Sequence, residues 1–480
     1  MQTPPPETGA ASPKGGAALW VALALFAVIV LSNLLMLRPR LTDRVDAWSS
    51  RIMQADFAVR MLYGNLLPLG AVQPDEWNNV LKLLTTRDAP LGALARAIIL
   101  VDDRSTTLGE QVARQRINDL LTRIPSAPTR FSAQQREAVI RWCRVVYGER
   151  RRISDAEAAE FRRTIDGANL GWMRLLALKH LEFRAGNADG ARVWDARAHQ
   201  EADRLQRVLL VVFGVVAFLI LGGVAMWVAF FAWKTSVRGL APVVSPLLPQ
   251  HADTVLWGLA VYFGATYVGG WVGGLLARAL PPSANLLVPL VLLVQVATGT
   301  VALWALHQKM RRDGVGWSEI GLDWNRLTAH FAWGTGAYVA MVPLLLVTVV
   351  LVQVLLPNLP SPAHPIAGVA STENPLWVTV LLFLVAGVFA PLFEEVFFRG
   401  VLLNAVWART GSRWVGIVGS ALVFSVLHPQ LYLGWIAVFV IGVVLGLLFV
   451  ERRSLVPCFW MHALNNSVAL VAMQLLKMAG

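Results

Sequence analysis

The sequence is poor in cysteine: its 480 residues include only Cys143 and Cys458. Two cysteines so far apart in the chain do not make a disulfide framework, and we expect no disulfide bond. The chain also lacks a Cys-x-x-Cys pair and a His-Glu-x-x-His motif, the usual signatures of zinc sites and zinc proteases. Neither covalent cross-links nor these zinc motifs therefore explain the fold or the function.

Charged residues are scarce in the carboxyl-terminal part. The 273 residues from Val208 onward hold 13 basic and 8 acidic residues, whereas Arg38 to Arg207 holds 28 and 21. The whole chain is 56% hydrophobic, which is too apolar for a soluble protein and predicts several spanning helices in a lipid bilayer. In the charged part arginines alternate with acids, so we expect no nucleic-acid partner despite the net charge of +12.

The composition divides the chain into four parts. Residues 1–16 are rich in proline, glycine and alanine and predict a disordered tail. Residues 17–37 form an apolar membrane anchor with a poor small-residue cleavage site, so we expect it to stay uncleaved. Residues 38–207 predict a soluble α-helical domain, with capping boxes beginning at Ser132 and Ser154. Residues 208–480 predict an eight-span membrane domain.

The predicted fold is therefore all-α: a polytopic membrane helix bundle of about nine spans with an inserted soluble helical domain. After the anchor, the expected apolar segments are 208–232, 254–276, 286–306, 329–356, 376–398, 412–428, 431–449 and 456–476.

Basic residues in the connections predict the topology. Lysine and arginine follow every second segment, whereas the loop 357–374 has neither. The positive-inside rule then places the amino terminus in the cytoplasm and the soluble domain across the membrane. We expect a multi-pass protein of a bacterial cytoplasmic (inner) membrane; its oligomeric state is not predicted.

A short charged stretch interrupts the apolar run near residue 395. Glu394, Glu395 and Arg399 lie in a segment that otherwise predicts a spanning helix. Charged side chains at membrane depth cost roughly 2.5–3.5 kcal/mol each on insertion scales, so they rarely occur without a function. Glu395 and Arg399 are spaced i, i+4 and can pair, whereas Glu394 projects to a different face. One carboxylate is thus stabilised and its neighbour is left for another partner.

Two further polar pairs follow on apolar helices: Phe424 with His428, and His462 with Asn466. Each pair is spaced i, i+4 and lies on one helix face. Taken singly, a histidine can cap a helix end and an asparagine can join helices, so each pair also has a purely structural interpretation. A carboxylate, two imidazoles and an amide within the last hundred residues together favour a catalytic site.

The expected depths in the bilayer agree only partly. Glu394 lies 16 residues before the turn near Thr410 and His428 lies 18 after it, so an antiparallel hairpin would bring them to one height. His462 follows Arg453 by nine residues and would lie closer to the cytoplasmic face. Either an extended segment before residue 458 or a hairpin that protrudes into the cytoplasm would correct this difference.

In this order, Glu-Glu-x-x-x-Arg, Phe-x-x-x-His and His-x-x-x-Asn resemble the motifs of the CPBP (CAAX-protease and bacteriocin-processing, or Abi) intramembrane endopeptidases. Gly316-Trp-Ser-Glu-Ile-Gly-Leu322 is similar to a stretch that precedes that core. The resemblance covers residues 300–476, and leaves out the anchor and the soluble domain.

The resemblance implies glutamate-dependent hydrolysis of a peptide bond with no cofactor. Glu394 would activate water with help from His428, and His462 and Asn466 would stabilise the oxyanion. The site-supporting residues would be Glu395, Arg399 and Phe424. If a divalent metal took part, it would be held by Glu394, His428 and His462.

Two other classes of function remain open at this stage. A membrane transporter or channel also carries glycine-interrupted spans and intramembrane carboxylates, although the polar residues here show no second half that mirrors them. A membrane scaffold or sensor with an inactive protease core is the other alternative. The expected partner is a peptide or membrane-protein substrate, whose identity and cleavage site the sequence does not give.

Overall fold

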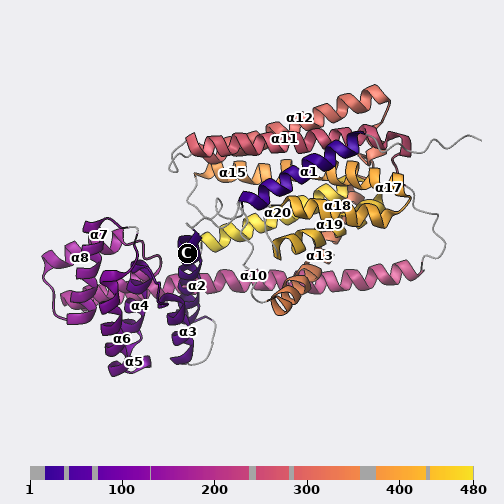
Figure 1. Cartoon of the computed structure of the whole chain (residues 1–480). Helices are drawn as coiled ribbons and strands as arrows, with labels where there is room; N and C mark the ends of the chain where they lie inside the picture. The colour runs from indigo at the N-terminus through magenta and orange to yellow at the C-terminus, as the bar shows by residue number, and fades with distance from the viewer. Residues whose placement is uncertain are drawn as a thin grey trace, which may run out of the picture. The chain divides into compact units, whose positions relative to one another are not determined.

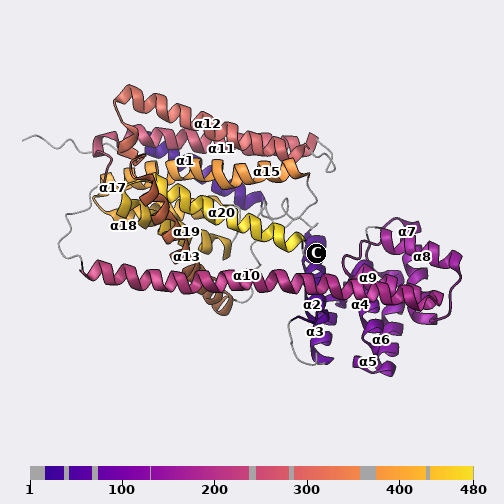
Figure 2. The same ribbon diagram turned by 180° about the vertical axis from the view of Figure 1, so that it is seen from behind.

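The computed structural model describes residues 17–36, 43–66, 74–129, 131–236, 245–279, 286–356, 375–428 and 433–478. Within these ranges every regular element is a helix (Figures 1 and 2). The chain divides into two compact units: one comprises Met1–Arg38 with Gly214–Gln474, and the other Pro39–Phe213 with Leu475–Gly480. We call the first the membrane unit and the second the helical unit. The predicted tail 1–16 and the loop 357–374 lie outside the described residues.

The helical unit is built from short helices around one apolar core. Trp77, Trp142 and Phe161 are among its fully buried side chains. Both predicted capping boxes are confirmed, because the Ser132 and Ser154 hydroxyls accept the amide hydrogens three residues later. The elements are α2 (Asp43–Tyr63), α3 (Pro74–Leu84), α4 (Leu91–Asp103), α5 (Ser105–Leu108), α6 (Glu110–Arg123), η1 (Ile124–Ser126), α7 (Ala133–Cys143), η2 (Arg144–Glu149), α8 (Asp155–Gly167) and α9 (Met173–Ala185).

A buried ionic cluster joins α4 and α9 inside this unit. The Asp103 side chain is almost wholly buried and contacts Lys179 Nζ at 2.9 Å, Arg104 Nε at 3.0 Å and His180 Nε2 at 3.2 Å. Burial alone would raise the pKa of Asp103, but His180, Arg104 and Lys179 together hold it well below its usual range. His180 lies on a stretch whose pattern predicts a packing or surface residue, and the structure shows it buried, with its ring packed edge-on against Tyr147.

Helix α10 (Ala188–Ser236) continues from the helical unit into the membrane unit without a break (Figures 1 and 2). Its first part is amphipathic and its second part is apolar, because the sequence changes composition near Val208 without a helix-breaking residue. The sequence boundary predicted at residue 207 therefore falls inside one helix. A compositional boundary is not a structural break when helix-forming residues continue across it.

The membrane unit contains the remaining helices. Seven helices of the described residues are long and apolar enough to cross a membrane, and two shorter ones, Ala17–Val30 and Arg413–Leu427, are also apolar. These nine segments correspond to the predicted spans, and the protein is a multi-pass membrane protein. The elements are α1 (Ala17–Met36), η3 (Pro249–His251), α11 (Ala252–Ala279), α12 (Leu287–Asp313), η4 (Trp317–Ile320), α13 (Leu327–Leu355), α15 (Leu376–Leu384), η5 (Val385–Phe389), α16 (Ala390–Glu395), η6 (Val396–Leu403), α17 (Asn404–Thr410), α18 (Arg413–Leu427), α19 (Leu433–Arg452) and α20 (Leu455–Met478).

The membrane unit is held together by contacts between neighbouring helices. Helices α11 and α12 lie side by side, as do α18 and α19, and α1 lies along α11 although it is distant from it in sequence (Figures 1 and 2). The core of the membrane unit is made mainly of aromatic and branched apolar side chains and includes Phe397, Phe424 and Phe449. The predicted all-α membrane bundle is confirmed, and the first helix is an integral part of it.

Candidate functional site

The two glutamates lie on a short α-helical stretch between two wider turns. Helix α16 (Ala390–Glu395) is flanked by the π-helical segments η5 and η6. Such turns are rare in proteins and occur frequently at functional sites. Apolar periodicity predicts an uninterrupted helix here, so the widened turns are a feature that the sequence analysis missed.

The first π turn leaves a backbone carbonyl available to α20. Within it the Ala390 N–H bonds to the Val385 carbonyl, five residues earlier. The next bond of that kind would join residue 391 to Ala386, but Pro391 has no N–H. The Ala386 carbonyl oxygen accepts a hydrogen bond from Asn466 Nδ2 at 2.8 Å instead. Pro391 is therefore the sequence signal for this contact between α15–α16 and α20.

Glu395 and Arg399 form the predicted i, i+4 pair inside the protein. Arg399 Nη1 donates to Glu395 Oε1 at 2.9 Å, and both side chains are 1% exposed. The guanidinium carbon of Arg399 also lies 4.5 Å from the centre of the Phe424 ring, where a cation is attracted to the π face. Arg399 thus fixes both the second glutamate and the aromatic ring of the next motif.

His462 lies between the two glutamates. Its Nδ1 is 2.8 Å from Glu395 Oε1 and its Nε2 is 3.6 Å from Glu394 Oε2. A carboxylate can only accept a hydrogen bond, so Nδ1 of His462 carries a hydrogen and donates a hydrogen bond to Glu395. Nε2 then faces Glu394, whose side chain is 18% exposed, compared with 1% for Glu395. The two adjacent glutamates therefore differ in environment: one is fully enclosed, and the other borders accessible space.

His428 ends helix α18 at the expected break. It caps the helix with an extended backbone conformation (ψ 135°), as expected for a residue before a proline, although Pro429 itself lies outside the described residues. Its Nδ1 lies 2.7 Å from the carbonyl oxygen of Phe424, and since a carbonyl only accepts, Nδ1 is the donor. That leaves Nε2 as the acceptor in the neutral ring. His428 also interacts electrostatically with both Glu394 and His462.

The ring of Phe424 joins the two histidines. Its centroid lies 4.5 Å from that of His428 and 5.8 Å from that of His462, in edge-to-face geometry with both. All seven side chains singled out in the sequence thus belong to one neighbourhood. Direct polar contacts link Glu394, Glu395, Arg399 and His462; Phe424 connects these to His428; and Asn466 binds the backbone of η5.

Among the described residues, no group of three histidine, cysteine or acidic side chains has the arrangement of a metal site. Two of the candidate ligand nitrogens are engaged elsewhere, since Nδ1 of His428 donates to a carbonyl and Nδ1 of His462 to Glu395. Only the Nε2 atoms of the two rings and the carboxylate of Glu394 remain for other partners.

The stretch Gly316–Leu322 supports the helices that carry the site. It contains η4 and turns at Gly321 (φ +87°), whose carbonyl accepts the Leu455 N–H at 2.7 Å where α20 begins. Gly400 of η6 lies so close to the Ile320 carbonyl that an added Cβ would be 3.0 Å away. Helix α19 ends at Arg452 and α20 begins at Leu455, so the extended segment considered for raising His462 is absent.

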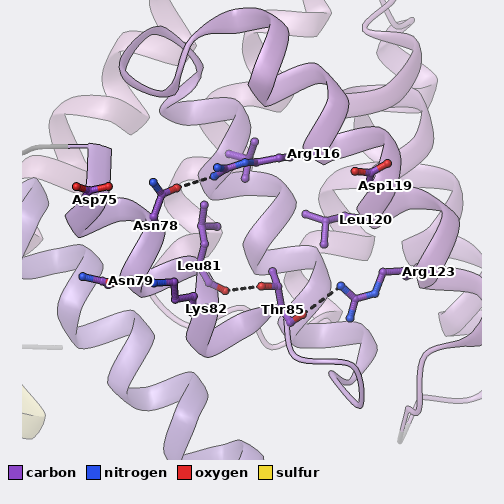
Figure 3. Close-up of a pocket in the computed structure, with 11 residues that line it drawn as sticks. Asp75, Asn78, Asn79, Leu81, Lys82, Thr85, Arg116, Asp119, Leu120 and Arg123 are labelled. Atoms are coloured by element: carbon purple, nitrogen blue, oxygen red, sulfur yellow. Dashed lines mark hydrogen bonds between the residues drawn. The ribbon is translucent and has the colours of Figure 1, made fainter.

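A second concave region lies in the helical unit. A groove of about 730 Å³ between α3 and α6 is lined by polar side chains over Leu81 and Leu120 (Figure 3). Arg116 donates to Asn78, and Arg123 to the Thr85 carbonyl, so its cations are engaged within the protein. The groove brings together no combination of nucleophile, base and oxyanion donors. The membrane unit therefore carries the candidate active site.

Comparison with known proteins agrees with this placement. Residues 375–468 match the family described as type II CAAX prenyl endopeptidase Rce1-like. No curated protein and no solved structure matches the chain. The matched residues run from the start of α15 to just past the middle of α20 and contain all seven side chains of the site, whereas α1, the helical unit and helices α10 to α13 lie outside. Over residues 375–468, this chain is therefore similar to the CAAX-protease (CPBP) family of membrane proteins.

Proposed function

We propose that this protein is an intramembrane endopeptidase that hydrolyses a peptide bond with water activated by Glu394. The observation that carries the proposal is the position of His462, which contacts the enclosed Glu395 through one nitrogen and faces the accessible Glu394 through the other. This arrangement supports the proposal because acyl transfer to water requires a base and a hydrogen-bond donor close together, the roles that we assign to Glu394 and His462.

In the proposed first step the oxygen of a water molecule attacks the scissile carbonyl carbon while Glu394 takes a proton from that water. His428 assists through Nε2, which is the free acceptor of its ring once Nδ1 donates to Phe424. The carbonyl π bond opens and its electron pair becomes the oxyanion. In the second step the carbon–nitrogen bond breaks, and the proton held by Glu394 passes to the leaving amine.

The oxyanion would be stabilised by His462 and Asn466. Since Nδ1 of His462 already donates to Glu395, its Nε2 can donate only when the ring is an imidazolium. Two carboxylates, the guanidinium of Arg399 and that imidazolium then sum to zero charge, which suits a largely enclosed group of side chains. Asn466 uses one N–H on the Ala386 carbonyl and keeps the second N–H of its amide for the oxyanion.

Glu395 and Arg399 position these groups without touching the substrate in this proposal. Glu395 fixes the orientation and tautomer of His462 through Nδ1, as outer carboxylates do for functional histidines elsewhere. Arg399 balances the charge of Glu395 and packs on Phe424. The substrate class proposed is a peptide or a segment of a membrane-associated protein that enters from the bilayer.

We also propose that the helical unit lies on the extracytoplasmic side of a bacterial inner membrane and the amino terminus in the cytoplasm. The support is the distribution of lysine and arginine among the connections. Single cysteines introduced at exposed Arg192 of the helical unit and exposed Arg311 after α12 would be modified from opposite sides by a membrane-impermeant thiol reagent. Modification of both from the same side would contradict this orientation.

The test of the protease proposal compares peptides in cells that carry wild type with those that carry Glu394→Gln. Purified protein in nanodiscs is then incubated with a membrane-protein peptide library, and new termini are read by mass spectrometry. We expect wild type to generate new termini and Glu394→Gln and His428→Asn to generate none. His330→Asn, which changes a buried histidine on α13, is the matched control and should retain activity. Solute uptake by proteoliposomes that is lost in Glu394→Gln, with no new termini, would instead identify a transporter.

A further inference from the structure

The helix end that carries His428 is bound by a side chain of the next helix. The last carbonyl groups of a helix have no partners within it. At the end of α18, the carbonyl of Phe424 accepts from His428 Nδ1 at 2.7 Å, and that of Ser425 accepts from the His428 N–H at 3.1 Å. The carbonyl of His428 itself accepts from Nε1 of Trp435, in the first turn of α19, at 2.8 Å. Two of these bonds are thus local, and the third comes from α19.

A second hydrogen bond runs from α18 back to the same tryptophan. Ser425 Oγ lies 2.5 Å from the carbonyl oxygen of Trp435, and since a carbonyl only accepts, the hydroxyl is the donor. The Ser425 residue is 2% exposed, so water does not compete for this bond. An indole N–H can only donate, so the direction of the first bond is certain as well. Two hydrogen bonds of opposite direction therefore join the end of α18 to the start of α19.

These bonds fix both the backbone and the ring of His428. The residue leaves the helical conformation (ψ 135°), so the hydrogen bonds of α18 do not hold its carbonyl. The indole of Trp435 holds that carbonyl, and the carbonyl of Phe424 holds Nδ1 of the ring. The ring also packs edge-on against Phe424, which meets His462 in the same geometry. With Nδ1 engaged, Nε2 is the free acceptor of a ring held at both ends.

Packing at this position does not by itself require an indole N–H. Phenylalanine would supply an aromatic ring, and water can satisfy a carbonyl at a helix end. What Trp435 adds is a donor whose acceptor is the backbone of a residue of the proposed machinery. A bond of the same kind joins Nε1 of Trp227 to the Ala340 carbonyl, also at 2.8 Å, between two helices that carry none of the seven site residues. Trp227 therefore provides a matched control.

We propose that Trp435 is a positioning residue of the protease site, because its indole N–H holds the backbone of His428. The His428 ring then keeps Nδ1 on the Phe424 carbonyl and presents Nε2 to the water that attacks the peptide bond. Ser425 holds Trp435 in place from α18. This inference rests on the function proposed above and adds to it a residue that lies outside the three motifs and does not touch the substrate.

The first test observes the His428 ring without any substrate. The chain has eight histidines, so histidine labelled with ¹⁵N in the ring gives a simple NMR spectrum of the full-length protein in nanodiscs. The resonances absent from His428→Asn belong to His428. We expect wild type to carry a hydrogen on Nδ1 and none on Nε2, and Trp435→Phe to shift these resonances as the other tautomer becomes populated. Trp227→Phe should leave them unchanged. Identical His428 resonances in wild type and Trp435→Phe would overturn the proposal.

The second test measures turnover of a peptide that wild type cleaves. Trp435→Phe should lower kcat about five- to tenfold, the effect of one hydrogen bond, with KM nearly unchanged because His428 acts on the water. Trp227→Phe should leave both constants unchanged. 3-Benzothienylalanine in place of Trp435 keeps the fused rings and replaces the N–H by sulfur, so it should lower kcat to the same extent. Wild-type kcat with this replacement would overturn the role of the N–H, whatever the NMR result.

Ser425→Ala tests whether the two hydrogen bonds act together. It should lower kcat by a smaller factor than Trp435→Phe, because the indole bond remains. The double variant should lower kcat by less than the product of the two factors, since both changes release the same residue. A decrease equal to the full product would overturn the joint action of Ser425 and Trp435.

These tests separate the inference from the function on which it rests. A wild type that cleaves no peptide contradicts the protease proposal and, with it, the role of Trp435 in turnover. Cleavage that depends on Glu394 and His428 but not on Trp435 contradicts this inference alone. Shifted His428 resonances together with a lower kcat support it.

Discussion

Replacing Arg399 by methionine tests how the enclosed half of the site is stabilised. Methionine keeps most of the apolar stem of arginine and removes the charge that faces Glu395. The structure shows an almost fully buried pair, 2.9 Å between Nη1 and Oε1, with both side chains 1% exposed. Solvent screening is therefore minimal, and among the described residues Glu395 would keep its contact with His462 but no arginine or lysine partner.

The expected loss in the free energy of unfolding is about 3–5 kcal/mol, the cost of removing one partner of a buried ion pair. The double variant Glu395→Gln with Arg399→Met leaves no unpaired charge, and Gln can still accept from His462 Nδ1. It should therefore lose less than the sum of the two single variants. Lys309→Met is the matched control, because Lys309 and Asp313 are also spaced i, i+4 but their side chains are 41% and 28% exposed. We expect Lys309→Met to lower the free energy of unfolding by less than about 0.5 kcal/mol.

The measurement is reversible unfolding of the full-length protein in mild detergent, followed at low and high salt. The Arg399→Met loss should be the same at both salt concentrations, because ions do not reach the pair. Additive losses in the double variant, or an Arg399→Met loss no larger than that of Lys309→Met, would refute the reasoning that the pair is held by mutual charge compensation inside the protein.

Three further predictions follow from the structure. Asn466→Ala should lower kcat by about 10²–10³, the effect of losing an oxyanion donor, whereas Asn465→Ala should retain most activity in the same peptide assay. Gly299→Ala should destabilise the membrane unit by about 1–3 kcal/mol, because its Cβ would overlap the ring of Phe393 on α16, whereas Gly270→Ala, with open space around it, should not lower the free energy of unfolding. The lowered pKa of Asp103 means that its ionised form stabilises the helical unit at pH values above about 4. Unfolding at successively lower pH should show that contribution disappear as the carboxylate becomes protonated, and Asp103→Asn should abolish this part of the pH dependence.

The sequence predicted the parts of the site that depend on spacing along one helix. The pairing of Glu395 with Arg399 follows from i, i+4 geometry, and the helix end at His428 follows from the next residue being proline. Both are local, so no knowledge of neighbouring helices is needed. The π turns on either side of α16 were not predicted, because apolar residues fill an α turn and a π turn equally well.

The contacts between helices required the three-dimensional structure. Counting residues from the charged connections did not establish the depth of His462 in the bilayer, yet its Nδ1 lies 2.8 Å from Glu395 Oε1. The partner of Asn466 is a backbone carbonyl, that of Ala386, which no sequence motif names. Tyr262 of α11 stacks on Phe397 of η6, although it precedes Phe397 by more than a hundred residues and carries no motif of its own. Such contacts depend on how helices cross, which single-helix periodicity does not specify.

By itself the sequence determined that this protein is an all-helical membrane protein and predicted a candidate site in the last hundred residues, since hydropathy and the cost of burying charge are properties of segments. Only the tertiary structure decided which glutamate is enclosed and which remains accessible. That difference arises because Arg399 and His462 both contact Glu395, whose side chain is 1% exposed, whereas the Glu394 side chain is 18% exposed.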